Sequence, residues 1–337
     1  MAKQETLLII SPAFHGYCYS IADGFAELGY RTVIHRYDAF DDFGAKLRNK
    51  ALYELPSKIG FDGQKVAEKY ATKLAIARLD EVKPDKLIVI KSDTLGEDFW
   101  NRVAPKNIPY MLWLYDDLKR HRYTTEFLQE LPVVLSYARS EAEKLADKGI
   151  NAHFLPNGYD PQLADLPTER AEEIVFVGSR YKNRVDTMIR LHEAGVPVRV
   201  YGRGWSHHPY DRLRMWEWSR PNLPSERDIP LSEAYHVQAG AAGALNIHGL
   251  QAGLAMRTFE VPGMNGLQLI DRPDVEEFYD VGTEVLLYRS QDELVELCQR
   301  IMSDDRWSEA IREAGRKRSL AEHTFFHRAQ MMDQLWD

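Results

Sequence analysis

The sequence predicts an α/β protein with two domains, each built around a parallel β-sheet. Three observations support this prediction. Short apolar runs alternate with helix-like stretches along most of the chain, a pattern typical of parallel βαβ units. The alternation stops once, in a proline-containing segment near the middle, and then restarts. A chain of 337 residues, 44% hydrophobic and 28% charged, is long enough to bury two cores.

The first half contains five expected strands. Each is a short apolar run with β-branched or aromatic residues, as in strands buried on both faces. They are Thr6–Ile10, Arg31–His35, Lys86–Lys91, Tyr110–Leu114 and Pro132–Ser136. Helices are expected over Tyr17–Leu28 and Gly63–Val82. In Gly63–Val82, apolar residues recur every three or four positions, as on one face of a helix.

The segment Leu155–Arg170 separates the two halves, since it holds three prolines and an Asn-Gly pair without an apolar period. We expect a linker there. The alternation then restarts with strands at Ile174–Val177, Val198–Tyr201, Ala244–Ile247, Leu267–Ile270 and Val285–Tyr288. The helices expected between them are Arg184–Ala194, Ser232–Ala241 and Met256–Pro262.

From Ser290 onward the pattern is almost continuously helical, with N-caps expected at Ser290 and Ser303 and a final amphipathic stretch at Thr324–Trp336. The expected domains are therefore two Rossmann-like units. Residues 1–157 form the first and residues 158–323 the second, and residues 324–337 form a terminal helix.

Composition excludes several classes of protein. Two distant cysteines, Cys18 and Cys298, make neither a disulfide framework nor a structural zinc site, so a reducing cytoplasm is expected. The chain has no apolar run of about 18 residues, which excludes a membrane-spanning helix and leaves only peripheral membrane association. All of the net charge of −8 lies after residue 157, where nonspecific attraction to nucleic acid or anionic lipid would be opposed.

Ligands of parallel α/β domains bind at the carboxyl ends of the strands, so the loops after the strands are the candidate sites. In the second half, the segment FVGSRYKNR is a strand followed by a tight turn and the start of a helix. Gly178 and Ser179 would offer backbone N–H groups to an anion, and Arg180 and Lys182 would add positive charge. The alternative is a tight turn with two solvated cations.

The segment VYGRGW places Tyr201, Gly202 and Arg203 at the end of the next strand. Its glycines would allow a ligand to approach the backbone closely. Trp205 either stacks on a nucleotide base or is a core tryptophan.

The segment MRTFE opens a helix with Met256, Arg257, Thr258 and Glu260. Arg257 and Glu260 are three apart and thus on one helix face, where the guanidinium would bind a diphosphate and the carboxylate two ribose hydroxyls. The alternative is an ordinary surface ion pair.

In the first half, His15 and Gly16 follow the first strand, and Asp116 and Asp117 follow the strand at Tyr110–Leu114. We expect these loops to hold an acceptor. A carboxylate there would take the proton from an acceptor hydroxyl or orient it. The alternative is an aspartate that caps the next helix. The candidate catalytic residues are accordingly Asp116, His15 and Arg257.

The order of several segments resembles the CgeB-like (spore maturation protein) glycosyltransferases. The resemblance is dense from about Ile174 to Arg328. It is carried by FVGSRYKNR, VRVYGRGW, ALNIH, MRTFEVPGMNGLQLIDRPDVEEFYDVGTEVLLYRSQDEL and EAGRKRSLAEHTFFHR. In the first half only SPAFHGY and SYARSEAEKLADKGINAHFLPNGYDP carry it. It implies the GT-B fold, in which two Rossmann-like domains face a cleft and the C-terminal helix returns to the first domain.

By this resemblance the protein would move a sugar from a nucleoside diphosphate sugar to an acceptor hydroxyl, retaining the anomeric configuration, without a metal or another cofactor. Glu260 matches the last acid of the family's Glu-x7-Glu pattern, but Ala252 stands at the position of the first acid. The contact to the sugar hydroxyls is therefore open, and Asn246 or His248 would supply it.

Two alternatives stay open. One is a phage-type glycosyltransferase that acts on a hydroxymethylated DNA base, suggested by Lys119, Arg120 and Arg122 and by the Trp/Arg-rich stretch Gly204–Pro221. We expect that stretch to line the donor pocket or to pack on the core. The other alternative is a noncatalytic sugar-nucleotide-binding or coat-assembly protein. The favoured acceptor is a glycan or small molecule.

Overall fold

The computed structural model of the chain describes residues 4–38, 63–167 and 169–336. It divides into two compact units, one formed by Met1–Pro156 with Phe325–Asp337 and the other by Asn157–Thr324. The expected first domain includes residues 1–3 and 39–62, and the expected linker includes residue 168. These positions lie outside the described residues.

The first unit has a six-stranded sheet in the order β2-β1-β3-β4-β5-β6, and all its strand pairs are parallel. The strands are β1 (Thr6–Ser11), β2 (Arg31–Arg36), β3 (Lys86–Ile90), β4 (Tyr110–Trp113), β5 (Val134–Ser136) and β6 (Ala152–Phe154). The helices are α1 (Tyr17–Glu27), α4 (Gly63–Val82), α5 (Glu97–Val103), α6 (Thr125–Gln129), α7 (Arg139–Ala146) and α14 (Phe325–Asp333).

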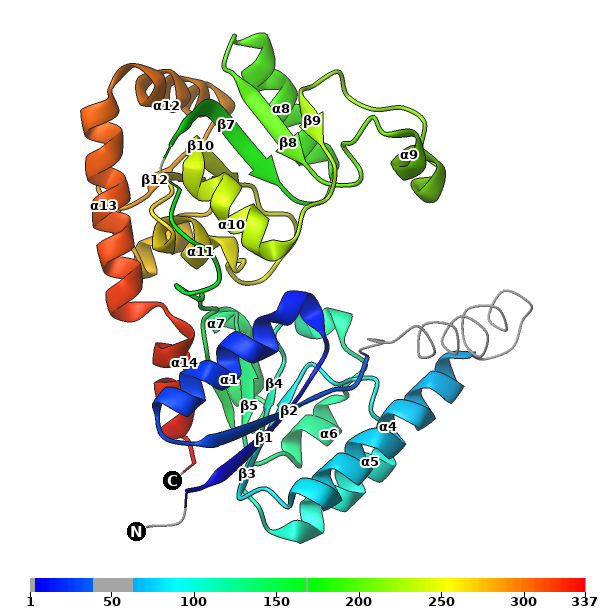
Figure 1. Cartoon of the computed structure of the whole chain (residues 1–337). Helices are drawn as coiled ribbons and strands as arrows, with labels where there is room; N and C mark the ends of the chain where they lie inside the picture. Colours follow the sequence, from blue (N-terminus) through cyan, green and yellow to red (C-terminus); the bar gives the residue numbers. More distant parts are fainter. Residues whose placement is uncertain (1–3, 39–62, 168, 337) are drawn as a thin grey trace. The chain divides into compact units, whose positions relative to one another are not determined.

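The apolar runs of this sheet are buried on both faces, as parallel strands require. Alternate residues such as Leu8, Val89 and Leu112 pack against α4 and α5 in one core. α14 packs against α1, far from it in sequence (Figure 1), and Tyr30 Oη donates a hydrogen bond of 2.5 Å to Asp333. The terminal helix therefore belongs to the first unit.

The second unit has a parallel six-stranded sheet in the order β12-β11-β10-β7-β8-β9. The strands are β7 (Ala171–Val177), β8 (Val198–Tyr201), β9 (Ser225–Glu226), β10 (Ala241–Asn246), β11 (Gln268–Ile270) and β12 (Leu286–Leu287). The helices are α8 (Lys182–Glu193), α9 (Pro209–Met215), α10 (Leu231–Gly240), α11 (Arg257–Gly263), α12 (Gln291–Ser303) and α13 (Asp305–Glu322).

The expected fold class, two Rossmann-like domains with a C-terminal helix on the first, is confirmed. The cap at Ser290 is confirmed too, because its hydroxyl accepts from the backbone N–H of Glu293. The cap at Ser303 is wrong. Ser303 ends α12, and the neighbouring Asp304 caps α13 by accepting from the N–H of Trp307 at 3.0 Å.

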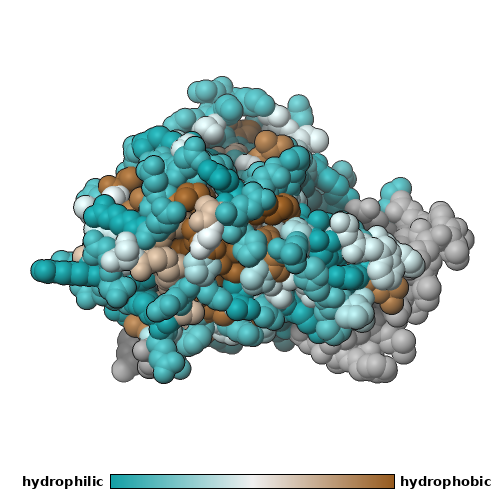
Figure 2. Space-filling view, turned by 90° about the horizontal axis from the view of Figure 1, so that it is seen from above, coloured by the Kyte–Doolittle hydropathy of each residue, from teal (hydrophilic) through white to brown (hydrophobic). Residues whose placement is uncertain are grey.

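The surface carries mostly polar residues. Figure 2 shows one face of the molecule as predominantly hydrophilic, with hydrophobic residues reaching it in small areas. In the described ranges no helix combines the length and apolar character needed to span a bilayer.

The packing of α14 on α1 predicts the effect of one added methyl group. At Gly24 of α1, a Cβ atom would lie 2.7 Å from the backbone oxygen of Phe325. We therefore expect Gly24→Ala to lower the free energy of unfolding by about 1–3 kcal/mol in urea titrations. Gly249→Ala is the matched control, since the same methyl would meet nothing within 4 Å there. Equal stabilities of the two variants would contradict this packing.

Candidate functional site

The loops that the sequence singled out in the second unit follow adjacent parallel strands. β7 pairs with β8 on one side and with β10 on the other. Because parallel strands end at the same edge of a sheet, the turn after β7, the turn after β8 and the loop after β10 lie together. This edge is the candidate site.

The turns after β7 and β8 approach each other closely at two glycines. Gly178 and Gly202 have φ angles of 151° and 145°, a region that disfavours residues with a side chain. A Cβ atom at Gly202 would lie 2.6 Å from the carbonyl oxygen of Gly178. The sequence predicted that these glycines let a ligand approach the backbone closely. In the structure, the close approach is that of one turn to the other.

Trp205 is a core residue. Its side chain is 1% exposed, its indole N–H donates to the carbonyl of Gly178 at 2.9 Å, and its ring meets Phe176 edge-on. The expected stacking of Trp205 on a base is thus corrected to a structural role. The sequence does not distinguish the two roles, because a tryptophan that follows a strand can be buried either by the protein core or by a ligand.

Two guanidinium groups converge on the ring of Phe176 at the end of β7. The Cζ atom of Arg257 lies 5.5 Å from the ring centroid and that of Arg184 lies 5.1 Å from it. The Nε–H of Arg257 donates to Gln238 at 2.7 Å, and its Nη2 donates to the carbonyl of Val177. The guanidinium of Arg257 therefore lies directly beside the turn at Gly178.

Arg184 was not predicted as a site residue. It is 9% exposed and donates from Nε and Nη2 to the carbonyl of Ile247 at 3.0 and 2.8 Å, and from Nη1 to Ser179 at 3.0 Å. Burial, followed by the charge of Arg257, lowers the pKa of Arg184 to about 10. Arg184 thus ties the turn after β7 to the loop after β10 and adds positive potential at the site.

The other predicted cations are held by carboxylates. Arg180 pairs with Glu217 at 2.5 Å, Lys182 with Asp186 at 2.7 Å and Arg203 with Asp228 at 3.2 Å. The hydrogen bond from Arg180 lowers the pKa of Glu217. Lys182 opens α8, whose N-cap Tyr181 gives no side-chain hydrogen bond to the first turn. The first N–H groups of α8 lie at the same sheet edge as Gly178 and Ser179.

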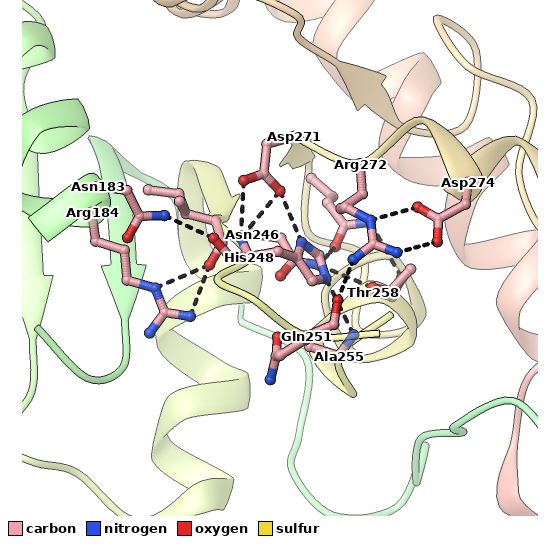
Figure 3. A network of polar contacts seen from close by, with 12 residues as sticks. Asn183, Arg184, Asn246, His248, Gln251, Ala255, Thr258, Asp271, Arg272 and Asp274 are labelled. Carbon is pink, nitrogen blue, oxygen red and sulfur yellow. Dashed lines mark hydrogen bonds and ion pairs between the residues drawn. The ribbon is translucent and has the colours of Figure 1, made fainter. Parts of the chain in front are cut away.

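Asn246 and Thr258, which Figure 3 shows, form a buried network with Gln268. Their exposed fractions are 1% and 0%, and the amide of Asn246 donates to the Thr258 hydroxyl at 3.0 Å and to Gln268 at 3.1 Å. This network joins β10, α11 and β11. Protein atoms bury both side chains, but the Oδ1 atom of Asn246 has no hydrogen-bond partner among the described residues, so the expected contact of Asn246 with the sugar stays a prediction.

His248 holds the loop after β10 in place (Figure 3). Its ring Nδ1 lies 2.8 Å from Asp271, and its Nε2 accepts from the backbone N–H of Ala255 at 3.2 Å. With Nε2 as an acceptor, Nδ1 is the ring atom that donates to Asp271. Arg272 braces the same loop by donating to the carbonyls of Gln251 and Ala252 at 2.9 and 3.1 Å. The expected sugar contact from His248 is therefore corrected to a structural role.

Met256 and Glu260 lie on either side of Arg257 along the chain, Met256 as the residue that caps α11. Glu260 is 5% exposed and accepts a hydrogen bond of 3.3 Å from Tyr235. Tyr201 and Gly202 lie at the end of β8, next to the turn after β7. The N–H of Gly178 donates to the carbonyl of Tyr201 at 2.9 Å. The predicted donor residues that surround the turn at Gly178 are thus brought together.

In the first unit, His15 and Gly16 have positive φ angles of 50° and 89° at the start of α1, and His15 is exposed. The carboxylate of Asp116 accepts from Arg120 at 3.2 Å and lies 3.6 Å from Lys91. Asp117 is 1% exposed and accepts a 2.5 Å hydrogen bond from Tyr137. Asp117 is therefore a buried structural residue, which corrects its expected contact with an acceptor.

The sequence of the chain is similar to that of known proteins. Residues 168–334 match the model of a family described as glycosyl transferase-like. The chain is 21% identical over 226 residues to the spore protein CgeB of Bacillus subtilis (strain 168). The aligned region covers 61% of this chain and 70% of that protein.

Solved structures are similar over nearly the whole chain. Sucrose-phosphate synthase (tll1590) from Thermosynechococcus elongatus has a TM-score of 0.64 at 13% identity, covering 99% of this chain and 98% of that one. Anabaena HepE, solved with UDP and glucose, has a TM-score of 0.62 at 11% identity, covering 98% and 99%. At these identities the likeness shows the fold, which is that of GT-B glycosyltransferases.

The contacts of Arg184 predict that it supports the site through the fold. Arg184→Gln leaves the carbonyls of Ile247 and Ser179 without their guanidinium donor, and we expect it to lower the free energy of unfolding by about 2–4 kcal/mol. Lys182→Gln is the control from the same helix, because its side chain is 89% exposed and its ion pair should contribute no more than about 0.5 kcal/mol. Urea unfolding of both variants measures the difference. Similar losses would mean that Arg184 is not a structural tie.

Proposed function

We propose that this chain, a member of the CgeB-like glycosyltransferases, transfers a sugar from a nucleoside diphosphate sugar to an acceptor hydroxyl with retention of configuration. Family membership and the GT-B fold support the glycosyltransferase activity. The single observation that carries the donor class is the convergence of Arg257 and Arg184 on Phe176, beside the turn at Gly178.

The charge of this edge suits a diphosphate. Two guanidinium groups repel each other, and the charge of Arg257 contributes to the lowered pKa of Arg184. An anion between Arg257 and the first turn of α8 would relieve that repulsion and would accept from free N–H groups. A phosphate oxygen could also replace the carboxylate of Glu217 on Arg180. Only oxygen acceptors of high charge density gain from all of these donors.

The same groups would promote departure of the nucleoside diphosphate. Negative charge grows on the leaving phosphate as the glycosidic bond breaks, and preorganised cations stabilise that charge more in the transition state than in the ground state. This role requires no metal and no cofactor beyond the sugar nucleotide, which we propose as the co-substrate. Glu260 is proposed to accept the ribose hydroxyls, with Tyr235 holding its carboxylate.

Gln251 is our proposal for the missing sugar contact. It stands next to Ala252, in the loop that His248 and Arg272 hold in place. Its side-chain oxygen is buried and has no hydrogen-bond partner among the residues that the structure describes. An unpaired buried amide oxygen is costly, and a sugar hydroxyl would satisfy it.

The acceptor is proposed to be a glycan or small molecule, presented near His15 and Asp116 of the first unit. A DNA acceptor would require free cations for phosphates. Lys119, Arg120 and Arg122 instead pair with Asp117, Asp116 and Glu68 at 3.4, 3.2 and 3.1 Å. Steep loss of acceptor binding with rising salt would favour the DNA base. A protein that binds the sugar nucleotide without releasing or transferring sugar would support the noncatalytic alternative.

The proposed diphosphate contact predicts a joint loss of binding and turnover in Arg257→Ala. Because HepE is solved with UDP, uridine diphosphate sugars are the first donors to test. We expect the affinity, measured by calorimetry, to fall by about 10- to 150-fold, which corresponds to a charged hydrogen bond of about 1.5–3 kcal/mol. Turnover should fall at least as far.

Arg190→Ala provides the control for that experiment. Arg190 lies on α8 and pairs with Asp292 at 2.7 Å on the exposed side, so both affinity and turnover should stay as in the parent protein. Unchanged donor affinity in folded Arg257→Ala would overturn the placement of the diphosphate.

The role of Gln251 predicts a difference between two ligands. Gln251→Ala should bind the free nucleoside diphosphate as the parent protein does, but bind the sugar nucleotide about 5- to 15-fold more weakly, since one hydrogen bond of about 1–1.5 kcal/mol is lost. Leu250→Ala, at a side chain that is 91% exposed, is the control. Equal losses for both ligands would show that Gln251 acts on the loop and not on the sugar.

A further inference from the structure

A group of large apolar side chains is exposed around α9, in the connection between β8 and β9. We call these residues the aromatic knob. Their exposed fractions are 77% for Trp216, 62% for Trp218, 55% for Tyr210, 52% for Leu213 and 37% for Met215. Figure 1 shows α9 standing apart from the helices that cover the sheet of the second unit. Within the stretch Gly204–Pro221, Trp205 packs on the core as expected and Glu217 binds Arg180, but the side chains of the aromatic knob do neither.

The aromatic knob is held in a fixed conformation. His208 caps α9 by accepting from the N–H of Tyr210. Asp211 is 2% exposed and accepts from the Nε and Nη2 atoms of Arg227 at 2.9 and 3.2 Å. Glu217 binds Arg180 at 2.5 Å and Arg220 at 3.1 Å. The apolar residues are therefore exposed on a segment that these hydrogen bonds and ion pairs hold in place.

Trp216 occupies a costly position. Its φ of 53° places it in the left-handed region at the C-terminal cap of α9, where glycine or asparagine is favoured. A side chain that is 77% exposed recovers little burial in return. Neither the backbone nor the core explains a tryptophan here. Local strain in an exposed, adjoining set of apolar residues points to an interaction with something outside the chain.

The charges that remain at the aromatic knob are positive. The carboxylates of Asp211 and Glu217, which lie in the same segment, are already bound by Arg227, Arg180 and Arg220. Arg212 and Arg214 of α9 have no carboxylate partner in the described part of the chain. The net charge of −8 opposes an anionic partner at long range, but at physiological salt its effect is screened beyond about 8 Å.

We propose that the aromatic knob inserts into the interfacial layer of an anionic lipid bilayer. Tryptophan and tyrosine favour the headgroup level, aliphatic side chains such as Leu213 and Met215 favour the acyl boundary, and arginine binds lipid phosphates. A glycan is the other occupant considered. Leu213 and Met215 offer no partner for hydroxyls, and the carboxylates that sugars need are paired, so the lipid surface fits better.

The test is sedimentation of the full chain with large vesicles of phosphatidylcholine, alone or with about 30% phosphatidylserine. We expect binding to the anionic vesicles and a loss of about tenfold or more in the partition coefficient of the Trp216→Ser/Trp218→Ser double variant. Arg214→Gln should lower the preference for the anionic vesicles. Val66→Ser, at an apolar side chain that is 54% exposed on α4, is the matched control and should bind as the parent protein does.

Nucleoside diphosphate binding reports on the fold of each variant, so a folding defect is separable from a lost surface. Absence of binding to both vesicle types would overturn the proposal. So would a double variant that retains its vesicle binding. Binding of the parent protein to soluble oligosaccharides, lost in the double variant while vesicles are not bound, would replace the lipid by a glycan. Vesicle binding and sugar transfer are measured separately, so failure of one leaves the other standing.

Discussion

The carboxyl end of β7 is the point on which the second unit depends. The turn at Gly178 has almost no room for side chains, because it lies against the turn of the neighbouring strand. The guanidinium groups beside this turn must also be held in place and shielded from solvent. The structure meets both requirements through the same residues. Trp205 and Arg184 bind the backbone carbonyls of Gly178 and Ser179, and Arg184 carries the contact onward to Ile247. The turn is thereby fixed before any ligand arrives, which lowers the reorganisation needed for binding.

The polar residues behind this edge form an inner layer of support. His248 and Arg272 hold the loop after β10, and Asn246 and Thr258 join β10 to α11. These specific pairs of buried donors and acceptors favour one arrangement of the loop. Arg257 begins α11 and is thus aimed at β7 by the same network.

Hydrophobic periodicity predicted the two sheets, ten of their twelve strands and the separate C-terminal helix, but it missed the short edge strands β6 and β9. A continuous apolar run such as Leu7–Ile10 is typical of a strand that is buried on both faces, as strands of a parallel sheet are. The identity of ligand-facing polar residues was less predictable. Asn246, Thr258 and Asp117 follow or flank strands, as ligand contacts do, but their partners are other side chains. Arg184 lacked a sequence signal, since a buried arginine on α8 has the same spacing as an exposed one. The exposed Trp216 was missed because aromatic residues are ordinarily buried.

The membership of α14 in the first unit has a consequence for synthesis of the chain. The first unit is discontinuous, since its last helix is synthesised only after all residues of the second unit. Until then the face of α1 around Gly24 and Tyr17 is without its partner Phe325. Completion of the first unit therefore depends on a segment that the chain supplies only after all residues of the second unit, so the two units are not assembled independently along the sequence.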